Sequence, residues 1–239
     1  EYILCHYTRQ HVTVALSGDG GAEVFAGYNQ HAAEWKMRQN SFANSIVKAG
    51  LPIWKSLPRS RNNKVTNLIR QLHRFAEGAN LSAKDRYWRW ASFNTKVQVD
   101  ALLKPATLQK VNTQVLAQEK AKILSCFETG DYNEVLQTDM NLVLLSDMLV
   151  KVDSMSMANS LEVRSPFLDY KVVDFAFSLP SDYKIDGSLK KKIVQDAFRP
   201  MLPTEIYNRP KHGFEIPLLD WFRNELWSLI NDELLKQSF

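Results

Sequence analysis

This sequence has few cysteines, a low net charge and no long apolar run. Cys5 and Cys126 are its two cysteines, and their wide separation fits neither a disulfide framework nor a metal site. No stretch reaches the roughly 18 apolar residues that a membrane-spanning helix needs, and the first residues lack the pattern of a signal peptide. We therefore expect a cytoplasmic protein with reduced thiols. Its 239 residues, 45% of them hydrophobic, suffice for one large or two small domains.

The net charge of +4 hides a local excess of basic residues. Residues 55–110 contain twelve Lys or Arg residues against three acidic residues. A basic helical stretch is one feature of nucleic-acid-binding proteins, but no nucleic-acid-binding motif accompanies this one. We favour a solvated face or the electrostatic steering of an anionic substrate. A nucleic-acid binder is kept as an alternative.

The glycine-rich stretch 16–28 lies between a predicted strand and a predicted helix. Residues 11–16 are β-branched and apolar, which is typical of a buried strand, and residues 23–35 can form a helix. A strand, a glycine turn and a helix in this order place backbone N–H groups and the positive end of the helix dipole at the turn. The turn is therefore a candidate site for phosphate or a nucleotide.

Three common site patterns are excluded at this turn. No Lys-Ser or Lys-Thr follows the glycines as in a Walker A loop, and Glu23 replaces the last glycine of a GxGxxG fingerprint. Ser17 does not sit in a nucleophile elbow, because Ala15 stands where that turn needs glycine. From the local pattern alone, the glycines could also serve only to close a tight strand-to-helix connection.

Almost every other segment is predicted to be helical, so we expect a predominantly α-helical chain with one clear parallel-type strand. Because a parallel strand belongs to a larger sheet, we expect its partner strands upstream of residue 1. Residues 132–159 are predicted to form one helix, in which Asp147 and Lys151 could pair at i, i+4. A further helix is predicted to begin at Gly187.

Two later segments place charged residues outside the predicted helices. In residues 161–169, Glu162 and Arg164 alternate to one side of an extended segment, and Pro166 ends any helix before it. Residues 208–217 are predicted to form a loop bounded by proline and glycine, in which the cation of Lys211 could be placed over a ligand.

Three motifs, taken together, resemble one family. They are SGDGGAE followed by GY within residues 17–28, DMLVKVD continuing to SLEVRSPFLD within residues 147–169, and NRPKHGF at residues 208–214. In their order and spacing, residues 1–239 resemble the C-terminal part of the ATP-dependent synthetase domain of glutamine-hydrolysing asparagine synthase. The resemblance implies that the whole domain has an α/β fold of the Rossmann-like adenine-nucleotide α-hydrolase type.

The resemblance also implies a reaction. The side-chain carboxylate of aspartate attacks the α-phosphorus of ATP, pyrophosphate leaves, and ammonia from glutamine converts the acyl-adenylate to the amide. ATP and Mg²⁺ are the cofactors implied, with Mg²⁺ on the pyrophosphate.

Roles follow from the resemblance residue by residue. Asp19 would help form the intermediate or manage the protons of ammonia, and Lys211 would stabilise negative charge around the α-phosphate. Glu162 is the third catalytic candidate, and together with Arg164 it either orients Lys211 and the ATP side of the pocket or forms an internal ion pair. The ATP-binding candidates are Ser17, Gly18, Gly20 and Arg164.

Ala22 and Ala26 depart from the family's pattern, and two of its parts are missing. Ala22 stands where the family usually has an aspartate that binds Mg²⁺, and alanine cannot coordinate a hard cation. Losing even an outer partner of a metal costs roughly 10 to 100-fold, so this loss should cost at least that. Ala26 replaces a usual glycine. The pyrophosphate-binding SGGxDS loop and the glutaminase domain with its N-terminal cysteine do not occur within residues 1–239.

We therefore expect these residues to be the C-terminal portion of a two-domain amidotransferase that is inactive without the rest. The missing glutaminase domain would be its partner, and a homodimer is compatible with this interpretation. Two further alternatives stay open. One is a catalytically silent homologue that acts as a binding module, and the other is a related ligase that amidates a different carboxylate.

Overall fold

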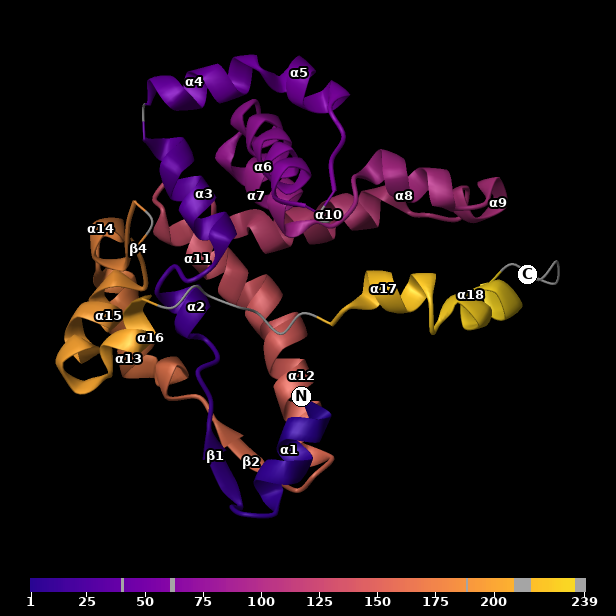
Figure 1. The fold of residues 1–239 in the computed structure, drawn as a ribbon. Coiled ribbons are helices and arrows are strands. Elements are labelled where there is room, and N and C mark those ends of the chain that lie inside the picture. The colour runs from indigo at the N-terminus through magenta and orange to yellow at the C-terminus, as the bar shows by residue number, and fades with distance from the viewer. Residues whose placement is uncertain (40, 61–62, 188, 209–215, 235–239) are drawn as a thin grey trace. The chain divides into compact units, whose positions relative to one another are not determined.

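The computed structural model describes all residues except 40, 61–62, 188, 209–215 and 235–239 (Figure 1). The chain divides into two compact units, Glu1–Ala197 and Phe198–Phe239. The described residues are mostly helical, which confirms the prediction of a predominantly α-helical chain. The Rossmann-like type of the whole domain stays a prediction.

The glycine turn follows a strand of a small parallel sheet. Strand β1 (Val14–Leu16) pairs in parallel with β2 (Glu162–Arg164) (Figure 1). In this register Leu16 lies opposite Arg164. The prediction of a single strand with all its partners upstream is wrong, because one partner lies downstream. Residues 162–164 form only three residues of strand, too few for a period-of-two pattern to identify them from sequence.

Helices make up most of the first unit. In chain order they are α1 (Tyr2–Arg9), α2 (Gly21–Val24), α3 (Asn29–Arg38), α4 (Phe42–Ala49), α5 (Leu51–Ser56), α6 (Lys64–Ala79), α7 (Ala83–Ala91), α8 (Lys96–Leu102), α9 (Pro105–Leu108), α10 (Thr113–Ile123), η1 (Leu124–Cys126), α11 (Asn133–Asp139), η2 (Met140–Met148), α12 (Leu149–Met157), η3 (Pro166–Leu168), α13 (Tyr170–Ser178), α14 (Ser181–Lys184) and α15 (Lys192–Phe198). Helix α1 packs against α12, and Arg9 Nε donates to the carbonyl oxygen of Ser160 over 2.9 Å.

The helix predicted for residues 23–35 is interrupted. It consists of the single turn α2 and the longer α3, with Ala26 between them at a φ of +58°. This left-handed conformation breaks the helical hydrogen bonding, and Gly27 N–H instead donates to the Ala22 carbonyl over 2.7 Å. The interruption leaves only one helical turn at the glycines, so the helix dipole there is weaker than the sequence suggests.

Residues 133–157 form one continuous helical segment, close to the predicted 132–159. Its middle part, η2, is a π-helix. The wider turn of a π-helix changes which side chains are neighbours, and the predicted ion pair between Asp147 and Lys151 does not form. Within the described residues, Lys151 Nζ instead lies 3.5 Å from Met148 Sδ.

The helix predicted from Gly187 is replaced at its start by a hairpin. Strands β3 (Ile185–Asp186) and β4 (Leu189–Lys190) pair antiparallel, and Gly187 in the turn between them has a φ of +58°. Helix α15 begins only at Lys192.

Three clusters of buried apolar side chains form the core of the first unit. The cluster nearest the glycine turn contains Val24 and Phe25 at the end of α2 and Ala176 of α13, with Phe167 and Leu168 packed against it. The residues that follow the turn and those that follow β2 are therefore anchored in the same core. The other two clusters are centred on Tyr132 with Leu136, and on Tyr87 with Leu124.

The second unit holds η4 (Arg199–Met201), α16 (Thr204–Asn208), α17 (Leu218–Arg223) and α18 (Trp227–Leu234). Over the described part of both units, every helix is too short or too polar to cross a membrane.

Candidate functional site

The candidate site lies where the two parallel strands end. Strand β1 ends at Leu16 and β2 at Arg164, and the N–H of Ser17 donates to the Arg164 carbonyl over 2.8 Å. Carboxyl ends of parallel strands meet at one edge of a sheet, where α/β proteins commonly bind ligands. The pairing therefore brings the first turn residue beside the second predicted motif, although almost 150 residues separate them in sequence.

Ser17 and Asp19 form a local turn at this edge. The Ser17 hydroxyl donates to Asp19 Oδ2, and the Asp19 N–H lies 3.3 Å from Ser17 Oγ. Both side chains are half-buried. The hydroxyl therefore holds the Asp19 carboxylate close to the end of β1. The two predicted residues are hydrogen-bonded to each other at this edge.

Gly20 leaves no room for a side chain as the structure stands, and Gly21 leaves little. Gly20 has a φ of +83°, and a Cβ built on it would lie 2.2 Å from Leu168 Cδ2. A Cβ on Gly21 would lie 3.0 Å from Phe167 Cδ2. At Gly18, in contrast, no heavy atom lies within 4 Å of the position that a Cβ would take. The turn thus needs glycine for its conformation and packing at position 20, and leaves open space at position 18.

Two backbone N–H groups of the turn, those of Gly18 and Gly20, have no acceptor among the described residues. Unpaired N–H groups in a glycine turn are suited to oxygen atoms of an anion. The geometry therefore fits the predicted roles of both glycines in holding phosphate oxygens.

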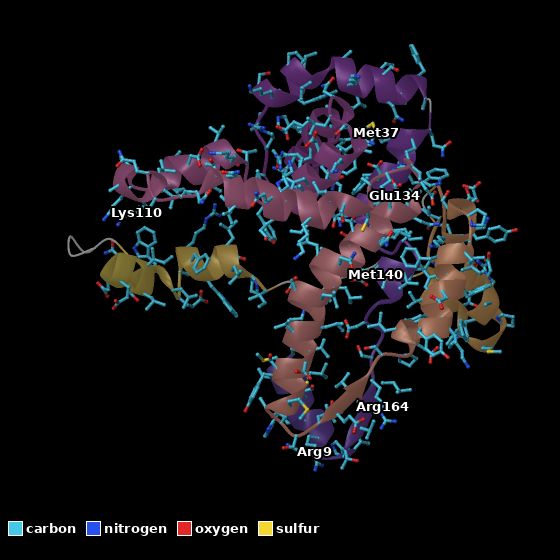
Figure 2. All side chains as sticks on the ribbon, turned by 180° about the vertical axis from the view of Figure 1, so that it is seen from behind. Arg9, Met37, Lys110, Glu134, Met140 and Arg164 are labelled. Atoms are coloured by element: carbon cyan, nitrogen blue, oxygen red, sulfur yellow. The ribbon has the colours of Figure 1, made fainter. Side chains whose placement is uncertain are left out.

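Glu162 and Arg164 form an exposed ion pair on β2. Arg164 Nε lies 2.7 Å from Glu162 Oε1, and the Arg164 and Glu162 side chains are 64% and 56% exposed. Arg164 is labelled in Figure 2. An internal ion pair was one of the two predicted interpretations, and the pair does form. The exposure also leaves the Arg164 guanidinium, on the strand next to β1, accessible to solvent. Lys211 lies outside the described residues, so its predicted role is untested.

Behind the turn lies a buried polar network that the motifs did not indicate. Tyr28 OH donates to Oε1 of the buried Glu23 over 2.6 Å, and burial followed by this hydrogen bond raises the pKa of the Tyr28 phenol far above its usual value. His31 Nε2 lies 2.7 Å from Asp139 Oδ2, and Tyr87 OH donates to Asp139 Oδ1 over 2.5 Å. The network thus connects α2 with α3, α7 and α11.

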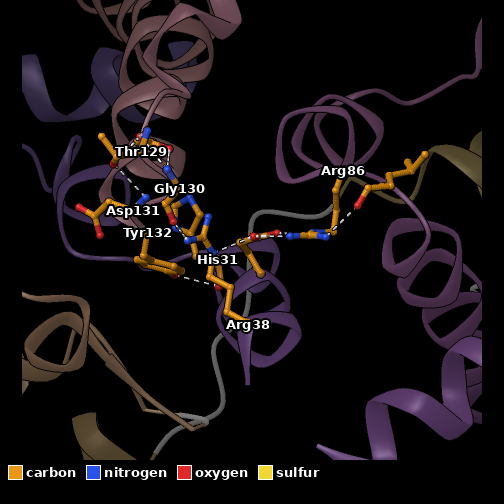
Figure 3. Close-up of polar contacts among 10 residues, drawn as sticks. His31, Arg38, Arg86, Thr129, Gly130, Asp131 and Tyr132 are labelled. Atoms are coloured by element: carbon orange, nitrogen blue, oxygen red, sulfur yellow. Dashed lines mark hydrogen bonds and ion pairs between the residues drawn. The ribbon is translucent and has the colours of Figure 1, made fainter. Parts of the chain in front are cut away.

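The same network continues into a buried ion pair. Arg86 donates to the Glu34 carboxylate through Nε over 2.6 Å and through Nη2 over 2.8 Å. Arg38 also binds Glu34, and it donates to the carbonyl oxygen of Gly130 (Figure 3). Tyr132 OH donates to the carbonyl oxygen of His31 over 2.9 Å (Figure 3). Arg38 and Glu34 are four residues apart on α3, but the other contacts had little signal in the sequence, since their partners lie far apart along the chain.

A metal ion is not supported by the described residues of this site. Ala22 offers no side-chain oxygen, and the described part of the chain contains no group of three His, Cys, Asp or Glu side chains arranged to hold a metal. Mg²⁺ would need ligands from elsewhere or from ATP itself.

Comparison with known proteins decides the family. The family model for asparagine synthase matches residues 1–238. The chain belongs to the asparagine synthase family. It is 29% identical to asparagine synthetase [glutamine-hydrolyzing] 1 of Bacillus subtilis over 94% of this chain and 34% of that protein. It is 30% identical to a putative asparagine synthetase [glutamine-hydrolyzing] of Mycobacterium bovis over 93% of this chain and 32% of that protein.

The chain therefore spans about a third of the length of these curated relatives. A shorter region, 31% of the chain, is 38% identical to a probable asparagine synthetase [glutamine-hydrolyzing] of Acanthamoeba polyphaga mimivirus. No solved structure matches the chain. Membership of the asparagine synthase family confirms the predicted resemblance, while the roles of individual site residues stay proposals.

Proposed function

We propose that this chain supplies one half of the ATP site of a cytoplasmic, glutamine-dependent asparagine synthetase. The observation that carries the proposal is the contact of the glycine turn with β2 at the carboxyl edge of the β1–β2 sheet, where the Ser17 N–H donates to the Arg164 carbonyl. The unpaired N–H groups of the turn and the exposed guanidinium of Arg164 on the neighbouring strand would suit a polyanionic nucleotide. The names of the relatives support asparagine as the product.

In the proposed reaction, an oxygen of the aspartate β-carboxylate bonds to the α-phosphorus of ATP, and the bond to pyrophosphate breaks. Ammonia derived from glutamine then attacks the acyl carbon, AMP leaves, and the nitrogen loses a proton. The N–H groups of Gly18 and Gly20 would hold phosphate oxygens, and Arg164 would offset their charge. Asp19, held by the Ser17 hydroxyl, would accept the proton.

Two further predicted roles belong to this proposal. Glu162 would fix the direction of the Arg164 guanidinium through their 2.7 Å contact. Lys211 would add a second cation at the α-phosphate. Because the described residues do not fit Mg²⁺ by themselves, no step is assigned to the metal.

The experiment is aspartate-dependent exchange of labelled pyrophosphate into ATP. We expect no exchange with residues 1–239 alone, because this chain lacks the SGGxDS loop that the family uses for pyrophosphate. We expect exchange when the same sequence is present within the full-length protein. Robust exchange by the isolated chain would overturn the half-site proposal.

A second measurement tests the residues. In the full-length protein, Asp19→Asn should lower the rate of asparagine formation by at least tenfold, as loss of a general base commonly does. Asp182→Asn is the matched control, because Asp182 is an exposed carboxylate on α14, away from the turn in sequence. Equal rates in both variants would remove Asp19 from the mechanism.

Ala22 favours a second candidate, a catalytically silent homologue that serves as a binding module. This candidate predicts that the full-length protein binds ATP but neither forms asparagine nor exchanges labelled pyrophosphate into ATP.

A further inference from the structure

Helices α4 and α5 pack against α6 on one side and face solvent on the other (Figure 1). The indole Nε1 of Trp54 on α5 donates to the carbonyl oxygen of Val47 on α4 over 2.9 Å. Trp54 and Val47 are partly buried, as are Asn44 and Leu51 on the same two helices. These contacts fix which face of each helix points away from α6.

The face that points away from α6 carries large apolar side chains. On α4, Phe42 and Ile46 are four residues apart, which places them on one side of the helix, and Phe42 is 82% exposed. Ile53 and Leu57 have the same spacing at α5, and both are exposed. Exposed apolar side chains that cluster on one surface are typical of an interaction site.

The same two helices are basic. Lys48 of α4 and Lys55 of α5 are exposed. Residues 35–76 contain no Asp or Glu, and the acids that flank this stretch in sequence, Glu34 and Glu77, are each bound to an arginine. The stretch therefore contains no acidic residue that offsets these two lysines. We define the α4–α5 surface as Phe42, Ile46, Lys48, Ile53, Lys55 and Leu57.

We propose that the α4–α5 surface binds to an anionic lipid membrane. The lysine ammonium groups would contact the negative headgroups, while Phe42 and Ile46 would enter the apolar layer beneath them. Protein–protein interfaces are depleted in lysine, which favours a lipid surface over a protein partner. The attachment would be peripheral, because over the described residues every helix is too short or too polar to cross a membrane. The proposal does not depend on the function of the glycine turn.

Co-sedimentation of the full-length protein with lipid vesicles tests the proposal. One set of vesicles contains phosphatidylserine and phosphatidylcholine in equal parts, and the other contains phosphatidylcholine alone. We expect the affinity for the mixed, anionic vesicles to be at least about tenfold higher. Equal affinity for both sets, or binding to neither, would overturn the proposal.

The apolar part of the contact is tested by two phenylalanine variants. Phe42→Ser should weaken binding to the mixed vesicles by at least about tenfold, because the serine has no ring to place in the apolar layer. Phe93→Ser is the matched control, because Phe93 is 94% exposed and lies outside the α4–α5 surface. Equal losses in the two variants would overturn the proposal.

The charged part is tested by two double variants that change the net charge equally. Lys48→Glu combined with Lys55→Glu should weaken binding to the mixed vesicles by at least about tenfold. The control combines Lys110→Glu with Lys122→Glu, at exposed lysines outside the α4–α5 surface. Equal losses in both double variants would show non-specific charge attraction and would likewise overturn the proposal.

Two other occupants of this surface give different results. If a second copy of the chain covers it, the full-length protein sediments as a dimer that Phe42→Ser converts to a monomer, and it does not bind vesicles. If another part of the full-length protein covers it, residues 1–239 bind the mixed vesicles and the full-length protein does not. Either result would overturn the proposal.

Discussion

His31 Nε2 lies 2.7 Å from Asp139 Oδ2, and both side chains are completely buried. The Tyr28 N–H lies 3.4 Å from His31 Nδ1, so that nitrogen accepts and Nε2 carries the proton donated to Asp139. Gln30 Nε2 also donates to Asp139 Oδ2, over 2.8 Å. One carboxylate of α11 therefore fixes two consecutive residues of α3, the helix that follows the glycine turn.

We predict that Asp139→Ala lowers the free energy of unfolding by about 3–5 kcal/mol, because it leaves the buried donors of His31 and Tyr87 without their acceptor. Urea unfolding followed by circular dichroism measures this change. The control is Asp182→Ala, which removes an exposed carboxylate and should change the free energy of unfolding by less than about 0.5 kcal/mol. A loss at Asp139 no larger than at Asp182 would show that this network does not stabilise α3.

Gly18 and Gly20 stand two residues apart in one turn, yet we predict opposite responses to alanine. Gly20→Ala should destabilise the chain by about 2–4 kcal/mol, because the new Cβ meets Leu168 and the φ of +83° disfavours an L-residue. Gly18→Ala should stay within about 0.5 kcal/mol of the parent, because no heavy atom lies within 4 Å of its Cβ position. Thermal unfolding compares the two, and similar changes in both variants would contradict the geometry of the turn.

Local features of the fold were predictable from sequence. The glycine turn, the long helix near 132–159 and the helical character of the chain follow from patterns within a single segment. The irregular positions within helices could not be predicted. No residue type marks the π-helix at Met140–Met148. Ala26 adopts a left-handed conformation that a glycine at this position would have indicated. The family's usual glycine at that position is consistent with this backbone.

Long-range contacts of the candidate site were not predictable in the same way. The pairing of Leu16 with Arg164 joins segments almost 150 residues apart, and three residues of strand carry too little pattern to show it. The Glu34–Arg86 ion pair and the His31–Asp139 contact depend on how helices cross, which residue spacing within one helix does not specify. Motif order could therefore suggest candidate site residues, whose roles stay predictions, but it could not reveal the buried network behind the turn.

Ala22 offers a direct test of the missing metal ligand. In the full-length protein, we predict that Ala22→Asp raises the rate of asparagine formation at limiting Mg²⁺ by at least about tenfold, because a carboxylate is a preferred ligand of this cation. Ala22→Asn is the matched control of similar size without the charge. The measurement is the Mg²⁺ concentration at half-maximal rate, and no difference between the two variants would mean that Mg²⁺ is held without this position.

Lys184 gives the stability of the chain a specific dependence on pH. Its side chain is fully buried, its Nζ donates to Asn133 Oδ1 over 2.7 Å, and it lies 4.5 Å from the centroid of the Phe177 ring. Burial lowers the pKa of Lys184 from 10.5 to about 8, although the negative charge of Asp131 acts in the opposite direction.

The direction in which stability changes with pH follows from the number of protons that the folded and unfolded chains bind. Between pH 8 and 10.5 the unfolded chain holds a proton on Lys184 that the folded chain has released, so this lysine makes folding more favourable as the pH rises. We predict that the parent gains about 3 kcal/mol of stability relative to Lys184→Met across this window. Urea unfolding at a series of pH values measures the difference.

Lys122→Met, at an exposed lysine of α10, should show no such change. A constant difference between parent and Lys184→Met would mean that the buried amine keeps an ordinary pKa, and that its bond to Asn133 replaces the water it loses.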